Sequence, residues 1–433
     1  MDMKTVVALF DQSYGTVYEK LSQGKPVVCS TTGKNFDAAP APTAVILDFF
    51  WIAQLKATRA LTGRTVPVIS WVTGGSSMFL RLWGPEALGG LDDFGAKVHA
   101  EVALSGRHPI KVGDELYRKA QGTIVRIPGL PPMYDYEFQP QQIPFTIPVS
   151  LLLITGREFL LDSDGILIAS CDAYEKGPLD GVRQWFADWK KPIYTVGPLL
   201  PAGYTSTQSD ANESHSEIEH FLFKKQETHG KRSVVFISFG TAFWPTTPEY
   251  LEEVVDALLE KEMPFILSCA SPFANVPAEL SEKIKNSSLG LLAKWTPQQF
   301  VLNHPATGWF LTHGGHGGIT ESLASGIPLI CWPFDGDQPT AAVHVTENLK
   351  VAFELIEVRT GQGLRPICRN GKTPKGTREA VGEEIRRVLD SCKGEEGEQL
   401  RRNAERLRGE LADAWKEGGT ASVAISQFLE KYT

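Results

Sequence analysis

Short apolar runs alternate with amphipathic segments along most of this chain, and that alternation is what most restricts its fold. In the first half, runs of a length suited to buried strands occupy residues 43–48, 67–70, 165–169 and 193–196. Residues 49–61, between the first two runs, have the spacing of a helix. Parallel strands need such crossovers, so the pattern predicts an α/β fold with a parallel sheet.

The second half repeats the same kind of pattern. Residues 234–238 (VVFIS) predict a strand, Thr247-Pro248 a helix start with proline at its first position, and residues 264–269 the returning strand. Further strands are predicted at residues 289–295, 308–312, 327–332 and 351–355. Together the two halves predict two Rossmann-like domains with a cleft between them.

Changes in composition indicate the domain boundaries. We predict a first domain over residues 1–202, opening with an amphipathic helix at 1–25, and a second domain over 233–415. Serine, threonine, asparagine, aspartate and glycine dominate the start of residues 203–232, which we interpret as an interdomain linker. Residues 416–433 include a Gly-Gly pair followed by a predicted final helix.

Charge and cysteine usage exclude several classes of protein. The formal net charge of −8 argues against nucleic acid as a partner, because such proteins need a dense basic surface. No apolar run is long enough to span a membrane, and the first residues lack the pattern of a secretory signal. The six cysteines are scattered without a CxxC pair, which favours reduced thiols and a cytoplasmic location over disulfides or zinc.

A glycine-rich turn carries the first indication of chemistry. Residues 313–318 read HGGHGG between the strand at 308–312 and a predicted helix at 319–325. Such a turn brings backbone N–H groups and a helix dipole to one anion, although a tight turn that packs the helix on the sheet has the same composition. The turn is not a GxGxxG fingerprint and lies late in its domain, which disfavours the alternative of an NAD(P)-dependent oxidoreductase.

The residues around this turn are far more specific. Residues 295–338 closely resemble, without a gap, the plant-type secondary-product signature of family 1 UDP-glycosyltransferases. Shorter matches to the same family lie at residues 46–50, 164–169, 196–201 and 234–241. The resemblance implies a GT-B fold, that is, two Rossmann-like domains facing a cleft. It also implies a UDP-sugar held by the second domain as co-substrate, with no metal or other cofactor.

The resemblance also implies roles for single residues. Trp295 is expected to stack on uracil, with Gln298 beside it at the base or ribose, and Glu321 to accept hydrogen bonds from the ribose hydroxyls. The residues expected at the diphosphate are Thr241, His313 and Gly318.

The transferred sugar is the next expectation. Asp337 and Gln338 are expected to bind its hydroxyls, and a glutamine at the second position is associated with glucose donors, which favours UDP-glucose. Plant members carry Trp-Asn-Ser where this chain has His316-Gly317-Gly318, so two side-chain contacts to phosphate or sugar are absent.

The acceptor side is less complete. Members of the family that invert the anomeric centre use a histidine after the first strand as general base, oriented by an aspartate that Asp48 matches. Neither His99 nor His108 follows a strand that could be the first one, so the first domain is expected to be N-terminally truncated relative to the family. Two hypotheses follow: inverting transfer of a hexose to a hydroxyl of a small lipophilic acceptor, or a UDP-sugar-binding remnant or isoform without a productive base.

Two further groups of residues have open interpretations. Aromatic residues after the first-domain strands are either an acceptor pocket or plain core: Phe49, Phe50, Trp51, Trp71, Phe79, Trp83 and residues 134–138. Residues 162–164 spell a DxD triplet, but they match a strand entrance of the family, so no metal is assigned to them.

Overall fold

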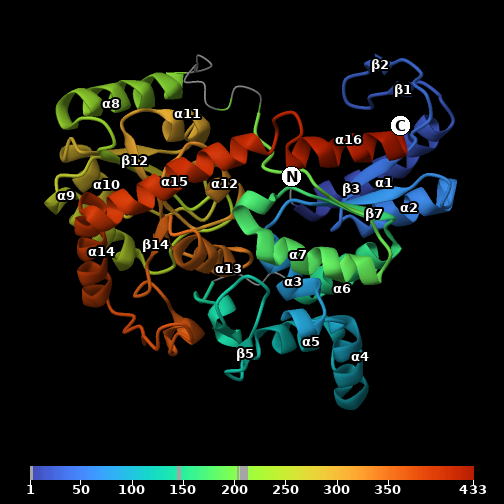
Figure 1. The fold of residues 1–433 in the computed structure, drawn as a ribbon, viewed down its shortest axis with the longest axis horizontal. Coiled ribbons are helices and arrows are strands. Elements are labelled where there is room, and N and C mark those ends of the chain that lie inside the picture. Colours follow the sequence, from blue (N-terminus) through green and yellow to red (C-terminus); the bar gives the residue numbers. More distant parts are fainter. Residues whose placement is uncertain (1–2, 144–147, 202–203, 205–212) are drawn as a thin grey trace.

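Two parallel β-sheets organise the molecule, one in each half of the chain (Figure 1). The computed structural model describes residues 3–143, 148–201, 204 and 213–433. Helices cover the faces of both sheets, which is the arrangement that buried parallel strands require. The α/β class and the two-domain architecture predicted above are confirmed.

The first sheet has the order β3-β4-β7-β8, and all its pairs are parallel. Its strands are β3 (Val45–Asp48), β4 (Val68–Val72), β7 (Gly165–Ile168) and β8 (Ile193–Thr195). Its helices are α1 (Met3–Ser22), α2 (Ile52–Thr62), α3 (Ser76–Trp83), α4 (Phe94–Ser105), α5 (Pro109–Arg118), α6 (Val149–Asp162) and α7 (Asp172–Asp188). Two short antiparallel pairs stand outside it, β1 (Val27–Val28) with β2 (Asn35–Phe36) and β5 (Ile124–Val125) with β6 (Met133–Tyr134).

Strand β3 differs from its prediction as a buried strand. It is the outermost strand of the described sheet and pairs only with β4, so Ile46 is 50% exposed. Helix α1 packs along α2 beside it, where Tyr14 hydrogen-bonds Thr58 at 2.8 Å and Tyr18 hydrogen-bonds Thr62 at 2.9 Å. The predicted helix over residues 1–25 is therefore present, and residues 1–2 lie outside the described part of the chain.

The second sheet has the order β11-β10-β9-β12-β13-β14 and is parallel throughout. Its strands are β9 (Val234–Ser238), β10 (Phe265–Ser268), β11 (Gly290–Ala293), β12 (Thr307–Thr312), β13 (Leu329–Cys331) and β14 (Ala352–Glu354). The helices between and after them are α9 (Pro248–Glu260), α10 (Ala278–Asn286), α11 (Gln298–Asn303), α12 (His316–Ala324), α13 (Gln338–Val343), α14 (Arg378–Lys393) and α15 (Glu395–Asp413). Helix α9 begins after Thr247 with Pro248 at its first position, as predicted.

Much of the stretch predicted as a linker, residues 203–232, is helical. Residues 213–229 form helix α8 (Glu213–His229), which buries Ile218 and Leu222 in the core of the second domain. The polar composition before residue 213 led to the linker interpretation despite these two apolar side chains. They are spaced one helical turn apart and hold the helix in place. Residues 203 and 205–212 of the predicted linker lie outside the described part of the chain.

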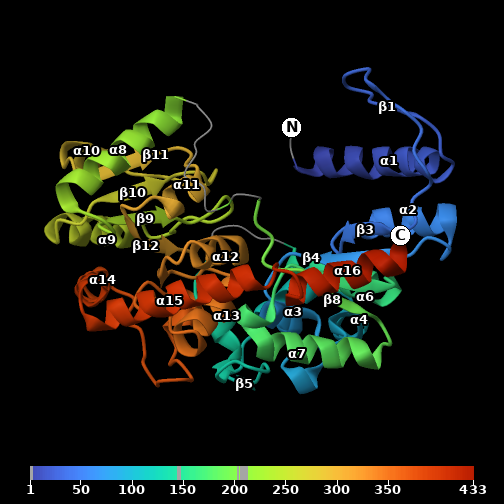
Figure 2. The ribbon, with the colours of Figure 1, turned by 45° about the horizontal axis from the view of Figure 1, so that its top comes forward.

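Helix α16 (Thr420–Tyr432) ends the chain and crosses back to the first domain (Figure 2). Its Phe428 and Tyr432 pack in one apolar cluster with Ile69, Leu167 and Tyr194 of the first sheet. This contact ties the two domains together through a segment that is far from their junction in the sequence.

No helix within residues 3–143, 148–201 and 213–433 has the length and apolar character needed to cross a membrane.

Candidate active site

The candidate site lies where the second sheet reverses its strand order. The chain runs from β9 outward through β10 to β11, then returns to β12 on the other side of β9 and continues to β13 and β14. Ligands of open α/β sheets bind beyond the carboxyl ends of the strands at such a reversal. A cavity of about 630 Å³, here called the strand-end cavity, opens at this place.

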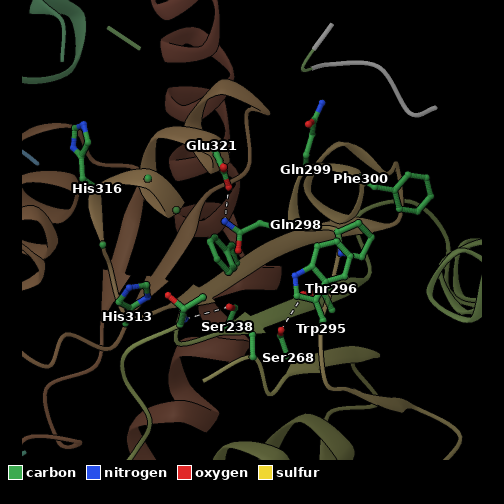
Figure 3. A pocket seen from close by; sticks show the side chains of 18 residues that line it. Ser238, Ser268, Trp295, Thr296, Gln298, Gln299, Phe300, His313, His316 and Glu321 are labelled. Atoms are coloured by element: carbon green, nitrogen blue, oxygen red, sulfur yellow. Dashed lines mark hydrogen bonds between the residues drawn. The ribbon is translucent and has the colours of Figure 1, made fainter. Parts of the chain in front are cut away.

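Four strand ends supply its walls. Thr241 lies in the turn after β9, Ser268 ends β10, Trp295 follows β11 and His313 follows β12. Figure 3 shows Trp295 on one side of the cavity and His313 on the other. Trp295 is 56% exposed, and an aromatic side chain in this position offers a face suited to a flat ring.

Gln298 and Glu321 meet in the middle of the cavity (Figure 3). The amide of Gln298, at the start of α11, donates to the carboxylate of Glu321 on α12. Burial raises the pKa of Glu321, and the hydrogen bond from Gln298 opposes that rise. The carboxylate keeps a further oxygen for hydroxyl donors of a ligand.

Two glycines lie close to the Cε1 and Nε2 atoms of the His313 ring. A Cβ atom at Gly240 would lie 2.8 Å from Cε1 of the ring, and one at Gly315 would lie 2.6 Å from Nε2. Gly240 also has a φ of +71°, which side-chain-bearing residues rarely adopt. Burial lowers the pKa of His313, while the nearby charge of Asp337 opposes that shift.

The first turn of α12 points its N–H groups at the same space. The N–H of His316 donates to the Asp337 carboxylate at 2.8 Å. The next two residues, Gly317 and Gly318, line the cavity, and first-turn amides have no partner inside their own helix. With the helix dipole, they form a site suited to an anion.

A second cavity, of about 580 Å³, adjoins the first and is here called the aromatic cavity. It lies mainly in the first domain and is lined by Phe49, Phe50, Met78, Phe79, Leu82, Trp83, Leu152, Leu153 and, from the second domain, Phe243. Both cavities have His316 and Gly317 in their walls, so these residues mark where the two spaces meet. An apolar molecule in one cavity would therefore lie next to a ligand in the other.

The structure divides the aromatic residues singled out from the sequence. Phe49, Phe50, Phe79 and Trp83 line the aromatic cavity. Trp51 instead packs against Phe10 of α1, and Trp71 packs in the cluster beneath α16. Residues 134–138 form the β6 end and η2 (Asp135–Phe138), where Tyr136 donates to the Pro366 carbonyl of the second domain. For Trp51, Trp71 and residues 134–138 the structure therefore supports the core interpretation. Their rings pack between helices or contact the other domain.

Two predicted site residues are absent from the walls of both cavities. Gln338 is only 2% exposed, and its Oε1 accepts the N–H groups of Phe334 at 2.8 Å and Asp335 at 3.2 Å. That oxygen supports the loop after β13, so only the amide nitrogen is left for the sugar, and the contact stays a prediction. Asp48 ends β3, and its carboxylate accepts the N–H of Phe50 at 3.0 Å; burial raises its pKa.

The DxD triplet has a structural role. Arg59 on α2 contacts Asp164 at 2.7 Å and Asp162 at 3.2 Å, and Arg64 contacts both carboxylates as well. These pairs join α2 to the loop between α6 and β7.

Sequence reasoning missed three residues. Ser268 and Thr296 line the strand-end cavity and share a hydrogen bond of 2.9 Å; the position of Ser268 at the end of a predicted strand was the available signal. His316 was noted only as a departure from the plant motif, yet its ring bridges the domains. Its Nε2 donates to the Ala169 carbonyl at 2.9 Å, an acceptor that no sequence spacing reveals.

Comparison with known proteins agrees with this geometry. The model of the family described as UDP-glucoronosyl and UDP-glucosyl transferase matches residues 198–362. UDP-glycosyltransferase eriJ of Hericium erinaceus is 32% identical over 408 residues, which are 90% of this chain and 78% of that protein. The chain belongs to the UDP-glycosyltransferases. UDP-glycosyltransferase 84A1 of Arabidopsis thaliana is 31% identical over 61% of this chain and 51% of its own length.

Solved structures place the transferase in the GT-B fold. A UGT transferase from Siraitia grosvenorii in complex with UDP superposes with a TM-score of 0.69, at 20% identity, over 100% of this chain and 88% of that one. Phytolacca americana UGT2, complexed with UDP-2fluoro-glucose and pterostilbene, superposes with a TM-score of 0.67 at 23% identity. That match covers 98% of this chain and 80% of the other. This transferase therefore has the two-domain fold that the motifs predicted, and it uses a UDP-sugar donor, as its family does.

Proposed function

We propose that this transferase moves glucose from UDP-glucose, with inversion at the anomeric carbon, to a hydroxyl of a small lipophilic acceptor. The observation that carries the proposal is the contact of the strand-end and aromatic cavities at His316 and Gly317. Relatives support the sugar and the acceptor class: hydroquinone glucosyltransferase of Rauvolfia serpentina is 28% identical over 71% of this chain and 63% of its own length.

The strand-end cavity holds the UDP moiety in this proposal. Trp295 stacks on uracil, Gln298 lies at the base or ribose, and Glu321 accepts from the ribose hydroxyls. Their support is the exposed indole and the Gln298–Glu321 hydrogen bond, which presents a carboxylate to the cavity. The negative net charge of the chain does not oppose this, because a nucleotide needs only local donors.

The diphosphate lies between His313, Thr241 and the first turn of α12. As the acceptor oxygen bonds to the anomeric carbon and the bond to UDP breaks, negative charge develops on the leaving phosphate. The Gly317 and Gly318 amides and the α12 dipole face that charge.

The sugar lies at the junction of the two cavities. Asp337, which is bound to the His316 N–H, lines that junction and is our proposed contact for the sugar hydroxyls. The amide nitrogen of Gln338 is the second proposed contact, since its oxygen is held by the loop after β13.

Asp48 is our proposed partner of the base that takes the acceptor proton. Its position at the carboxyl end of β3, next to the cavity residues Phe49 and Phe50, supports this role. Among the described residues, the hydrogen bond to its carboxylate comes from the Phe50 amide. Because that hydrogen bond comes from a backbone amide and not from a base, it favours a second candidate function: binding of the UDP-sugar with impaired transfer.

One experiment separates the two candidates. The protein is incubated with UDP-glucose and a panel of phenolic and sterol acceptors, and glucosides are detected by mass spectrometry. Transfer supports the enzyme, whereas thermal stabilisation by UDP without any product supports binding alone. The anomeric configuration of a product, measured by NMR coupling, tests inversion.

Replacing Asp48 tests its part in proton removal. Asp48→Asn is expected to lower turnover by up to about 10⁴-fold, as loss of a carboxylate that orients a catalytic base does, and to leave the Kd for UDP unchanged. Asp37→Asn, on an exposed loop residue of the same domain, is the control. A normal turnover rate in Asp48→Asn would remove this carboxylate from the mechanism.

We also infer a cytosolic location. All six cysteines are free thiols, three of them buried, as expected for a reducing compartment. Fractionation of the native host tests the location.

A further inference from the structure

A third cavity, of about 390 Å³, continues from the aromatic cavity and has a different chemistry. It is here called the polar cavity, and the two share Tyr117, Val149 and Asp335 in their walls. Its other walls come from the end of α5, the residues after η2, and η4 (Gly361–Leu364) of the second domain. The side chains that decide its chemistry are Arg118, Gln139, Gln142, Gln362 and Asp335.

Two of its glutamines each use one amide N–H on a carbonyl of α5. The amide nitrogen of Gln139 donates to the Tyr117 carbonyl at 3.2 Å, and that of Gln362 donates to the Arg118 carbonyl at 3.1 Å. These are the last carbonyls of α5, which have no partner within their own helix. The amide oxygen and the second N–H of both glutamines therefore remain for another molecule.

The remaining groups add one more acceptor and two sources of donors. One oxygen of Asp335 accepts the Gly336 N–H at 2.7 Å, which leaves its other oxygen available. The guanidinium of Arg118 lies close enough to oppose the rise in the pKa of Asp335 that burial causes. Within the described residues, no hydrogen bond uses the side-chain amide of Gln142.

This combination selects a ligand of one kind. Hydroxyl groups both donate and accept, so a neutral group rich in hydroxyls satisfies the amide oxygens, the carboxylate and the guanidinium together. An apolar group would leave these polar groups without partners, and an anion would face Asp335 and two amide oxygens. The aromatic cavity beside it favours the opposite, a body without polar groups.

We propose that the two cavities together bind an amphipathic acceptor, whose apolar body fills the aromatic cavity and whose glycosyl unit fills the polar cavity. This rests on the proposed function, and it makes the substrates lipophilic glycosides that receive a further sugar. The polar cavity meets the aromatic cavity at Asp335, whereas the donor side meets it at His316 and Gly317. A hydroxyl of the apolar body can thus face the donor while the existing sugar is held elsewhere.

The transfer step is unchanged by this placement. The acceptor oxygen forms the new bond to the anomeric carbon, the bond from that carbon to the diphosphate breaks, and UDP leaves with the bonding electrons. The hydroxyl proton passes to solvent.

A matched pair of ligands tests the proposal. Esculetin, a dihydroxycoumarin, and its 6-O-glucoside esculin are titrated into UDP-saturated protein by calorimetry. We expect the glucoside to bind at least about tenfold more tightly than the aglycone, because hydrogen bonds in the polar cavity are made only by its sugar. Equal affinities, or tighter binding of the aglycone, would overturn the proposal.

Gln142→Leu tests whether the preference for the glucoside arises in the polar cavity. The side chain of Gln142 is exposed, so this variant is expected to fold; it should weaken glucoside binding by about tenfold and leave aglycone binding unchanged. Gln427→Leu, on the exposed side of α16, is the control. Equal weakening of both ligands by Gln142→Leu would contradict the polar cavity as the sugar site.

A parallel transfer assay with UDP-glucose keeps the two proposals distinguishable. If the proposed function fails, neither coumarin gains a sugar, while the binding difference between them remains. If the inference fails, esculetin is glucosylated and no preference for the glucoside is seen.

Discussion

Two glycines lie so close to the ring of His313 that neither leaves space for a side chain. A Cβ atom at Gly315 would lie 2.6 Å from Nε2 and 3.2 Å from Cε1 of the ring, so Gly315→Ala must displace the imidazole. If His313 binds the diphosphate, the displacement costs a charge-assisted hydrogen bond. We expect the Kd for UDP to rise by about tenfold or more, measured by calorimetry.

Gly409→Ala is the matched control for that substitution. An added Cβ at Gly409, on α15, meets nothing within 4 Å, so UDP binding and folding should be retained. Because the same residue change is made at both positions, a difference in UDP affinity between the two variants reports the displaced ring. If Gly315→Ala bound UDP as the wild type does, the ring would have no part in holding the diphosphate.

Trp295 is the residue on which base recognition depends. Its indole is 56% exposed beside the cavity, and base stacking on an aromatic side chain is worth about 1–3 kcal/mol. Trp295→Ala is expected to weaken UDP binding by about tenfold or more, seen as loss of thermal stabilisation by UDP. Phe36→Ala, which removes an exposed aromatic side chain of the first domain, should retain thermal stabilisation by UDP. Unchanged stabilisation in the tryptophan variant would refute the stacking role.

Helix α16 follows the second domain in sequence but packs on the sheet of the first, so its contribution to stability can be measured. Phe428 is 5% exposed and contacts Tyr194 edge-on, at 5.3 Å between ring centroids, whereas Leu429 on the same helix is 47% exposed. Phe428→Ala should lower the free energy of unfolding by about 3–5 kcal/mol, because it removes a ring and leaves a cavity. Urea denaturation measures the loss.

Leu429→Ala provides the comparison on the same helix. Its side chain is already half in water, so its loss should cost well under half as much as that of Phe428. Equal costs for the two substitutions would mean that α16 is not held by the cluster on the first sheet.

For the molecule as a whole, a buried group of charges joins the two domains. Arg369 of the second domain lies 3.8 Å from Glu137 of the first and also contacts Glu347 and Glu354. Burial alone would raise the pKa of Glu354, but the charges of Arg369 and Arg359 outweigh it and hold the pKa below its ordinary value. Removing one cation therefore leaves carboxylates buried without compensation.

Arg369→Met tests this group of charges. We expect a loss of about 3–5 kcal/mol in the free energy of unfolding, as for other buried pairs broken from one side. Because the aromatic cavity depends on both domains, transfer should fall more than UDP binding does. Arg387→Leu removes an exposed arginine of α14 and should cost less than about 1 kcal/mol. An unchanged free energy of unfolding in Arg369→Met would show that these charges do not hold the two domains together.

Local patterns predicted the strands of the second domain but not its helix α8, whose residues were interpreted as part of a linker. Strand runs such as residues 234–238, the proline start of α9 and the glycine turn at His313 are encoded by neighbouring residues, because periodicity and turn geometry act over a few positions. The strand-end cavity lies beside that turn, since parallel strands bring their carboxyl ends together.

Contacts between distant segments could not be read in this way. Gln338 is a separate case, because it lies within the motif and the neighbouring backbone N–H groups of Phe334 and Asp335 hold its amide oxygen. The position of β3 at the sheet edge, the docking of α16 on the first sheet and the polar cavity between the domains arise from residues far apart in the chain. The linear chain was enough to predict most of the strands and the glycine-rich turn, because those depend on local backbone preferences, while the candidate nucleotide site came from the resemblance of residues 295–338 to the family. Which side chains reach each cavity was settled only by folding, because that depends on packing between elements.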